Sequence, residues 1–409
     1  MILKYFPVFK YRDFRLLWFS ELVSRIGTTM VTVAISWHLY LLTHSPFALG
    51  LIGLFQLIPF LFFNLFGGVF ADAHDRRKIL RFTQPLFALA SLVLGISTVF
   101  HFVSPFLIYL MIAIVAVGLA FDMPARNALL PSLIDKKDLS NANSVYGILE
   151  DFTEMIGPAV GGFLIAFIGL ANIYFLDAIS TVFVFFAILA MHTSGIPTGE
   201  KATISFKAVI ESVQYLFSKK LLWSTKLLDG LSVLFASCII LMPVFAKDVL
   251  HVGPTGLGFL YAAPAVGAVL TGLVMSRVSS KIKKQGKLLL LVVAIYALAT
   301  IAFGLSTSFP LSLLFLAILG AANCVSVVIR ATIRQLHTPS HMMGRLYALF
   351  SFIWVSGDKL GDLEAGILAG FIGAPFAVII GGAAALTVVG TVAATIPELR
   401  NFTLEKDTI

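Results

Sequence analysis

The chain has 409 residues, of which 59% are apolar and only 12% are charged, and its mean hydropathy is +0.97. A soluble globular chain carries about 25% charged residues, so this chain has too little polar material to cover a water-facing surface. Its net charge of +8 lies mostly in short connections between apolar runs, a placement that indicates membrane orientation and argues against a nucleic-acid partner.

Twelve apolar runs are long enough to cross a bilayer as helices, since roughly 17–25 residues span about 30 Å of hydrocarbon. They occupy residues 16–41, 47–71, 79–101, 105–128, 142–167, 170–191, 221–246, 255–276, 287–306, 310–330, 345–370 and 375–396. Alternation with period two, the mark of a transmembrane barrel, is missing. The sequence therefore predicts an all-α membrane protein with twelve transmembrane helices. Because the first run lacks a small-residue cleavage site, we expect a retained helix rather than a signal peptide.

Lysine and arginine collect on one side of this predicted arrangement. Of the 29 such residues, 26 lie in the terminal segments and the alternate connections that share one side. One, Lys247, lies on the other side, and two, Arg25 and Lys359, fall inside predicted helices. Cytoplasmic loops carry the excess of basic residues, so we predict a multi-pass protein of a bacterial-type inner membrane with both termini in the cytoplasm.

The longest connection divides the chain into two six-helix halves. The predicted domains are an N-terminal bundle over residues 1–191, a cytoplasmic linker over 192–220 and a C-terminal bundle over 221–409. In the linker, apolar residues recur at helical spacing beside lysines, which predicts an amphipathic helix on the membrane surface, most simply a tether.

The two halves echo each other weakly. The end of the second predicted helix, Gly68–Asp72–Arg76–Arg77, is matched after the eighth by Gly272–Ser276–Arg277–Lys281, and Arg126…Pro131 is matched by Arg330…Pro339. These echoes predict two pseudo-symmetric bundles with a substrate path between them.

The stretch from Gly68 to Lys78 resembles the signature between helices 2 and 3 of the major facilitator superfamily. It has a glycine, an aspartate four residues later and then a basic cluster, although Ala73 stands where arginine is common. An acid that ends one helix can pair with cations that open the next, so Gly68, Asp72, Arg76 and Arg77 are candidates for a gate that holds one conformation closed. The alternative is a basic loop without a gating role.

A second motif, Gly157-Pro158-Ala159-Val160-Gly161-Gly162, lies in the fifth predicted helix. Small residues let helix backbones approach closely, and a proline inside a helix frees a carbonyl and permits bending. The run resembles the Gly-Pro motif of antiporters and exporters of the same superfamily. Physics alone predicts close packing of Gly157, Pro158, Gly161 and Gly162, and the resemblance implies export.

Further stretches narrow the resemblance to the enterobactin- and siderophore-exporter subfamily. They are residues 257–268, 334–346, 356–358 and 397–402. The resemblance runs over most of the chain and implies a proton-coupled exporter of a siderophore-like organic molecule, working by alternating access. Macrolide and multidrug efflux pumps are also related, so drug efflux and import of a small metabolite or iron chelate remain alternatives.

Acidic residues inside membrane helices are candidates for proton coupling, because each costs at least about 2.5–3.5 kcal/mol at the bilayer centre unless it faces a partner or water. The candidates are Glu150, Asp151 and Glu154 in the fifth predicted helix, Asp229 in the seventh, and Asp358 and Asp362 in the eleventh. The resemblance implies that the fifth and eleventh helices occupy equivalent places beside the central path, where facing carboxylates cannot both stay ionised easily. We expect Asp358, with Asp362 or Glu154, to carry the proton. The alternative is structural neutralisation by Lys359, Arg25 or a neighbouring helix.

The candidates for binding the substrate are Glu21 and the cations Arg25, Lys359, Arg126 and Arg330, of which the cations suit an anionic ligand. Glu21 lies one turn from Arg25 and can neutralise it, and Arg126 and Arg330 could equally be ordinary loop charges. Trp354 could stack on an aromatic cargo, although packing is the plainer role.

Other functional classes are disfavoured. Neither the eight histidines nor the two cysteines have metal-ligand spacing, so no metal and no other cofactor is expected. The absence of a Gly-Lys-Ser/Thr phosphate loop argues against a membrane enzyme and against ATP-driven transport. A non-transporting receptor remains the alternative from another class. The expected partners are a small-molecule substrate, protons and the lipid bilayer, for a monomer to which a periplasmic or outer-membrane exit system is a candidate partner.

Overall fold

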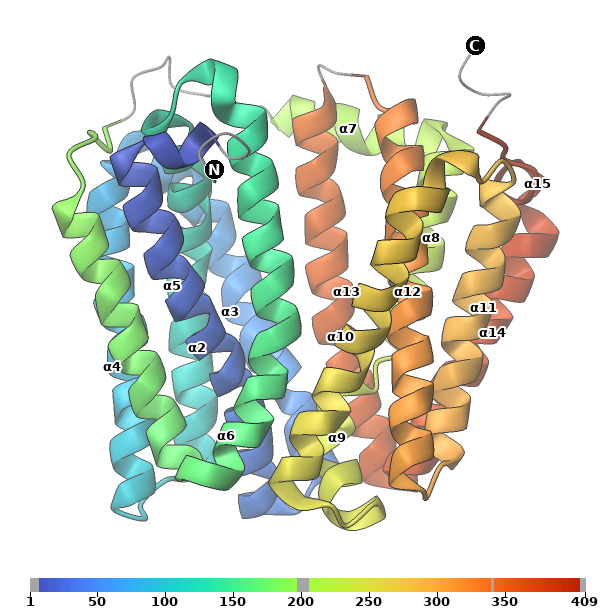
Figure 1. Ribbon diagram of the computed structural model, residues 1–409, viewed down its shortest axis with the longest axis horizontal. Helices are drawn as coiled ribbons and strands as arrows, with labels where there is room; N and C mark the ends of the chain where they lie inside the picture. The colour runs from blue at the N-terminus through green and yellow to red at the C-terminus, as the bar shows by residue number, and fades with distance from the viewer. Residues whose placement is uncertain (1–6, 197–205, 340–341, 405–409) are drawn as a thin grey trace. The chain divides into compact units, whose positions relative to one another are not determined.

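The computed structural model describes residues 7–196, 206–339 and 342–404, and these contain helices and connections but no strand (Figure 1). The first half comprises α2 (Arg12–Thr43), α3 (Pro46–Ala73), α4 (Arg76–Val99), α5 (Pro105–Leu129) and α6 (Leu139–Ala190), with short 3-10 helices η1 (Pro7–Lys10), η2 (Leu130–Leu133) and η3 (Lys136–Asp138). The second half comprises α7 (Phe206–Ser218), α8 (Lys220–Phe235), α9 (Met242–Val244), α10 (Gly253–Val278), α11 (Gln285–Leu305), α12 (Phe309–His337), α13 (Met343–Ile372), α14 (Ala374–Thr395) and α15 (Pro397–Arg400). Three short elements interrupt it: the 3-10 helix η4 (Ile239–Leu241), the π-helix η5 (Phe245–Val249) and the 3-10 helix η6 (Ser279–Lys281).

Glycine turns separate the last two long helices of each half. Inside α6, Gly169 has φ 78° and ψ 167°, and the helix folds back there into two arms (Figure 1). Gly373 has φ 85° and ψ 152° between α13 and α14. Only glycine adopts such a backbone without strain, so both turns are explained by their sequence.

The predicted all-α, twelve-helix fold is confirmed. Ten helices of the described chain are long and apolar enough to span a membrane, and α6 counts once among them although it has two arms. The 30-residue α13 carries several charged residues and supplies the remaining span. Large apolar side chains such as Phe82, Phe106 and Phe371 are exposed, which suits contact with lipid.

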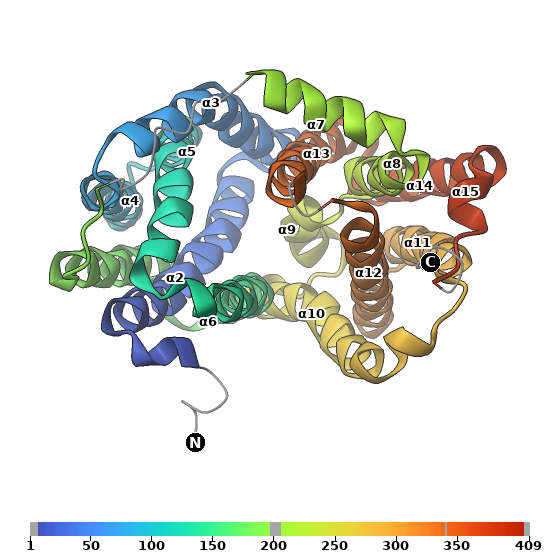
Figure 2. The same ribbon diagram turned by 90° about the horizontal axis from the view of Figure 1, so that it is seen from above.

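The chain forms two compact units. Unit 1 contains Met1–His44, Phe55–Thr203 and Pro254–Gly258, and unit 2 contains Ser45–Leu54, Ile204–Gly253 and Phe259–Ile409. The start of α3 therefore packs with the second half, and the start of α10 with the first. Within unit 1, α6 packs against α2 and α4, and within unit 2, α11 packs against α12 and α14 (Figure 2).

Helix α7 lies within the predicted linker, residues 192–220, where the sequence indicated an amphipathic helix. Part of the predicted linker, residues 197–205, is outside the described residues, and α7 follows. Leu216 of α7 is 4% exposed and joins the apolar core of unit 2 together with Leu222 and Leu228, whereas Phe217 is 66% exposed. One side of α7 is thus anchored to its own unit and the other is uncovered.

Candidate functional site

A buried ion-pair cluster joins α2 and α5 in unit 1. Arg126 on α5 forms an ion pair with Glu21 on α2, and its Nη2 and Nε atoms lie 2.7 and 2.9 Å from Asp122 Oδ2. The side chains of Glu21, Asp122 and Arg126 are only 2%, 4% and 12% exposed. A buried carboxylate is costly unless it is paired, so one guanidinium stabilises two acids here.

Neutral side chains complete the hydrogen bonding of these two acids. Tyr146 on α6 donates its hydroxyl to Glu21. On α4, Thr83 and Gln84 donate to Asp122 Oδ1 at 2.6 and 2.8 Å. Each carboxylate therefore receives bonds from an arginine and from at least one uncharged donor, as a buried charge requires.

Arg25 extends the cluster to Glu150. Its Nε lies 3.5 Å from Glu21 Oε2 and its Nη2 lies 2.9 Å from Glu150 Oε1. The expected pairing of Arg25 with Glu21 is present, and Arg25 also bridges α2 to α6. With Asp122 and Arg126 included, three carboxylates share two guanidiniums.

A related cluster lies in unit 2. Arg330 on α12 forms an ion pair with Asp229 on α8, and Lys226 Nζ lies 3.2 Å from Asp229 Oδ2. The side chains are 13%, 7% and 16% exposed for Arg330, Asp229 and Lys226. Two cations face one carboxylate, so this cluster carries excess positive charge, unlike the cluster of unit 1.

Aromatic rings adjoin these cations. Lys226 Nζ lies 5.0 Å from the centroid of the Phe350 ring, and the Arg334 guanidinium carbon lies 5.9 Å from the same ring. Arg334 also lies 5.3 Å from the ring of Tyr347. These distances are within the range of cation–π attraction. Phe350 is buried in the core of unit 2, whereas the ring of Tyr347 is exposed, so the excess cations and the Tyr347 ring suit an anionic, aromatic group.

The sequence assigned the members of these pairs separately, with Asp229 to protons and Glu21, Arg126 and Arg330 to substrate. In the structure, Arg126 pairs with Glu21 between the fourth and first helices of its half, and Arg330 pairs with Asp229 between the same two helices of the other half. The echo of Arg126 by Arg330 was a usable signal, and the acids match as well, since Glu21 and Asp229 are the tenth residues of α2 and α8. Asp122 was not singled out, although its i,i+4 spacing from Arg126 could have found it.

A third charged group lies on α13. Lys359 Nζ lies 3.0 Å from Asp358 Oδ2 and 3.5 Å from Asp362 Oδ2, and Ser237 donates to Asp362 Oδ1 at 3.2 Å. Lys359 thus contacts both acids, as the alternative of structural neutralisation supposed. Two carboxylates share one ammonium here, so a single proton on the pair would balance the charges of the group.

This group lies where α8 is interrupted. Helix α8 ends at Phe235, and the chain continues through η4, α9 and η5 instead of one regular helix. A Cβ atom on Gly361 would lie 2.9 Å from the carbonyl oxygens of Val233 and Leu234, so the backbone of α13 packs directly on the end of α8. Ser237, which contacts Asp362, belongs to the interruption. The interruption of α8 therefore supplies one hydrogen-bond donor to Asp362.

Asp151, Glu154 and Trp354 lie in a different environment. Asp151 and Glu154 are exposed on α6, and Trp354 is 46% exposed on α13. They differ in this from Asp362, Glu21 and Asp229, which are buried. Their predicted roles in coupling and binding stay predictions.

The cations of the gate motif bind helix ends within unit 1. Arg76 donates to the carbonyl of Ala128 at 2.9 Å, where α5 ends. Arg77 donates to three carbonyls at the end of α6, those of Ile188, Met191 and Thr193, at 3.0, 2.6 and 2.9 Å. Cations at helix C-termini stabilise unpaired carbonyls.

The acid of the motif lies apart from these contacts. Among the described residues neither Arg76 nor Arg77 forms an ion pair with Asp72, and Asp75, not Asp72, caps α4. Gly68 lies in α3, partly buried. The role of this motif in gating stays a prediction.

The small residues of the second motif face other backbones. A Cβ on Gly161 would lie 2.8 Å from the Cα atom of Met30, and one on Gly157 would overlap the Thr29 side chain, both on α2. Gly162 lies against Gly258 at the start of α10. Pro158 lies within α6 between these contacts. Side chains at these positions would push α6 away from its neighbours.

Asp177 is a buried acid that the sequence did not single out. Its side chain lies on α6 and is 4% exposed. Ser91 donates to Oδ2 at 2.5 Å and Thr28 lies 3.2 Å from Oδ1. In the described part of the chain no lysine, arginine or histidine forms an ion pair with it. Asp177 lies inside the predicted span 170–191, so an acid within an apolar run was a usable signal, although no charged residue at helical spacing marks a partner for it.

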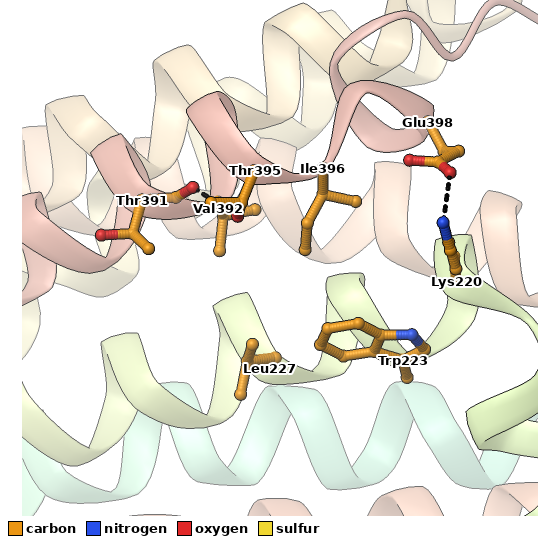
Figure 3. A pocket seen from close by; sticks show the side chains of 8 residues that line it. All are labelled: Lys220, Trp223, Leu227, Thr391, Val392, Thr395, Ile396 and Glu398. Carbon is orange, nitrogen blue, oxygen red and sulfur yellow. Dashed lines mark hydrogen bonds and ion pairs between the residues drawn. The ribbon is translucent and has the colours of Figure 1, made fainter.

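A surface pocket lies elsewhere in unit 2, between α8 and α14 (Figure 3). Its volume is about 220 Å³, and its lining residues are Lys220, Trp223, Leu227, Thr391, Val392, Thr395, Ile396 and Glu398. Lys220 Nζ and Glu398 Oε1 pair at 3.0 Å, so its two charges satisfy each other. None of the charged clusters lines it, and we assign it no role in transport. Over the described residues, no three His, Cys, Asp or Glu side chains are grouped to hold a metal ion.

Sequence comparison places this chain among membrane transporters. A family model described as "Transmembrane secretion effector" matches residues 4–407. The enterobactin exporter EntS of Escherichia coli O1:K1 is 26% identical over 348 residues, which cover 85% of this chain and 83% of that protein. EntS of Citrobacter koseri is 25% identical with the same coverage.

Solved structures of transporters share the fold. A bacterial homologue of the lysosomal transporter Spinster has a TM-score of 0.71 at 16% identity, with 98% of both chains covered. A bacterial homologue of the iron transporter ferroportin has a TM-score of 0.71 at 17% identity, with 94% of this chain and 98% of that chain covered. At these sequence identities the similarity shows a shared fold and nothing about function.

Proposed function

The chain belongs to the transmembrane secretion effector family of the major facilitator superfamily, and on that premise we propose that it exports a siderophore-like organic molecule in exchange for protons. The observation that carries the proposal is the match to enterobactin exporters over 85% of the chain. As a transporter rather than an enzyme, it would move its cargo by alternating access between two halves.

The cluster of Lys226, Asp229 and Arg330 supports an anionic cargo. Its excess cation is buried, so an incoming anion would gain a strong interaction, because the surrounding dielectric is low. Tyr347, which is 60% exposed, offers a ring to an aromatic cargo.

The group formed by Asp358, Lys359 and Asp362 supports proton coupling. Two carboxylates that share one ammonium in a poorly solvated place favour the state in which one of them holds a proton. Loss of that proton would leave a net negative charge, which pulls on Lys359. This is the coupling that the sequence predicted for Asp358 and Asp362, with Lys359 as the intervening group.

The charge distribution supports the proposed orientation. With 26 of 29 basic residues on one side, we place both termini in the cytoplasm of a bacterial inner membrane. Cargo released on the other side would then enter the periplasm, from which an outer-membrane exit system completes secretion. We propose a monomer as the transporting unit.

Direction and cargo are tested together by comparing metabolites secreted by cells with and without the gene. We expect cells without it to secrete less siderophore and to retain it inside. Slower uptake of an iron chelate with unchanged secretion would instead establish import. Loss of resistance to macrolides with unchanged siderophore secretion would establish drug efflux.

Coupling is tested by flux into proteoliposomes under an imposed pH gradient. We expect the gradient to drive flux by the normal protein and to have little effect on Asp358→Asn or Asp362→Asn. Glu398→Gln, which changes an exposed acid paired with Lys220 at the surface pocket, serves as the matched control and should keep coupling. Unchanged coupling in both α13 variants would overturn this assignment.

A further inference from the structure

We propose that Asp177 is a second proton-binding site, separate from the α13 group, at which the carboxyl is protonated while Thr28 and Ser91 hold it. The binding of a proton here follows from the local geometry alone. Its use in transport rests on the function proposed above.

The site lies in the interior of the membrane-spanning part of unit 1. Asp177 is eight residues beyond the turn at Gly169, and Ser91 is eight residues before the end of α4 at Val99. At about 1.5 Å per residue, both lie about 12 Å from their helix ends. Thr28 lies at the middle of the 32-residue α2. Three helices therefore meet around this carboxyl at membrane depth.

Among the described residues of the helices packed against it, no cation forms an ion pair with the carboxyl. On α2, Arg25 is engaged by Glu21 and Glu150, and His38 contacts the hydroxyl of Tyr174 at 3.2 Å. The basic residues of α4, residues 76–81, lie at its first two turns, ten or more residues from Ser91. On α6 itself, the titratable residue nearest in sequence to Asp177 is Tyr174, whose hydroxyl is uncharged at neutral pH.

An ionised Asp177 would be poorly compensated. Two neutral hydroxyls can donate to it, but they do not cancel its charge, and its exposure is only 4%. An unpaired carboxylate in such surroundings neutralises by taking up a proton rather than remaining charged. The acids of the other clusters do not share this property, because each lies beside an arginine or lysine.

The hydrogen-bond geometry fits the protonated carboxyl. The hydroxyl of Thr28 has one hydrogen, yet it lies 3.1 Å from the carbonyl of Ser24 and 3.2 Å from Asp177 Oδ1. If Oδ1 carries a proton, the carboxyl donates to Thr28, and Thr28 donates to the Ser24 carbonyl. Ser91 then donates to Oδ2 at 2.5 Å. In that arrangement every one of these donors has an acceptor.

The backbone of α2 is shaped to admit the carboxyl. A Cβ atom on Gly27 would lie 3.0 Å from Asp177 Oδ1 and 2.6 Å from Ser180 Oγ. Any side chain at position 27 would press on the carboxyl and on Ser180. Gly27 thus lets α2 lie against the acid, which keeps bulk water away from it.

The test is infrared difference spectroscopy of the purified full-length protein in lipid nanodiscs between neutral and alkaline pH. We expect a band from a protonated carboxyl at neutral pH that disappears in Asp177→Asn and persists in Asp151→Asn. Asparagine can donate to Thr28 as the protonated acid does, so this variant should keep its melting temperature. The band should shift in Thr28→Val and Ser91→Ala, which are second reporters of the same site.

Other outcomes distinguish failure of the Asp177 proton site from failure of the proposed transport function. The absence of a band assignable to Asp177 would overturn this proposal. So would a band that changes when choline replaces sodium in the buffer, because the site would then hold a sodium ion. If the band is present but the normal protein shows no flux in response to a pH gradient, the proposed function fails and the proton site stands. If both hold, flux by Asp177→Asn should lose part of its pH dependence.

Discussion

Arg330 on α12 forms an ion pair with Asp229 on α8, and a second cation, Lys226, shares the same carboxylate. The equivalent helices of the first half, α5 and α2, carry the pair Arg126 and Glu21. The two halves therefore use one construction with opposite charge balance. The first cluster has more carboxylates than cations, and the second has more cations than carboxylates.

Removal of Asp229 should destabilise unit 2. In Asp229→Asn, Arg330 and Lys226 face each other without a carboxylate, and breaking a buried pair costs about 3–5 kcal/mol. The double variant D229N/R330Q should recover part of this loss, because it leaves one cation. Unfolding by denaturant in detergent measures both. Glu398→Gln, at an exposed pair with Lys220, should leave the free energy of unfolding nearly unchanged.

Arg126→Lys should behave as a severe change although it keeps the charge. A lysine cannot reach Asp122 by two nitrogen atoms while it also pairs with Glu21, so one acid is left without its cation. We expect lower stability and lower transport, measured as melting temperature and flux. The matched control is Arg15→Lys, which leaves these contacts unaltered. Equal effects of the two substitutions would contradict this role of Arg126.

Gly162→Ala should impair the packing of α6 on the start of α10. The added Cβ would overlap Gly258, and overpacking costs about 1–3 kcal/mol. Gly147→Ala, on the same helix, is the control: a Cβ there meets nothing within 4 Å. That change should stabilise the helix by about 0.5–1 kcal/mol. Thermal unfolding of the two variants in parallel tests this. We expect the melting temperature to fall in Gly162→Ala and to rise in Gly147→Ala.

The contact of η1 with η3 should be insensitive to pH near neutrality. Hydrogen bonding to Asp138 raises the pKa of Lys10 above 10.5, and the Tyr11 hydroxyl lowers the pKa of Asp135 below 3.8. A raised lysine pKa contributes stability that is lost only as pH rises through it. A lowered aspartate pKa contributes stability that is lost only as pH falls through it.

Trp18, which contacts Phe9 of η1, reports this contact. With the other three tryptophans replaced, its emission should stay constant from about pH 5 to 9 and change below the ordinary aspartate pKa. Lys10→Gln should alter the emission at neutral pH. A transition centred near pH 7 in the unaltered contact would show that another group controls it.

The helices could be predicted from the sequence because each membrane span is a continuous apolar run. Glycines such as Gly169 lie at the turns between them. Pairing between helices could not be predicted in the same way. The partner of Asp229 is Arg330, about a hundred residues away, and nothing local joins them. Asp177 was harder still, because its partners are a serine and a threonine, residue types too frequent to stand out.

The interruption after Phe235 gives the second half a joint that the first half lacks. Helix α2 runs unbroken over 32 residues, whereas its counterpart α8 stops after 16 and continues through three short elements. A continuous rod transmits displacement along its whole length, but a segmented one can tilt its two ends independently. Motion that begins at Asp362 can therefore be absorbed locally in the second half, while a push on α2 must carry the entire helix with it.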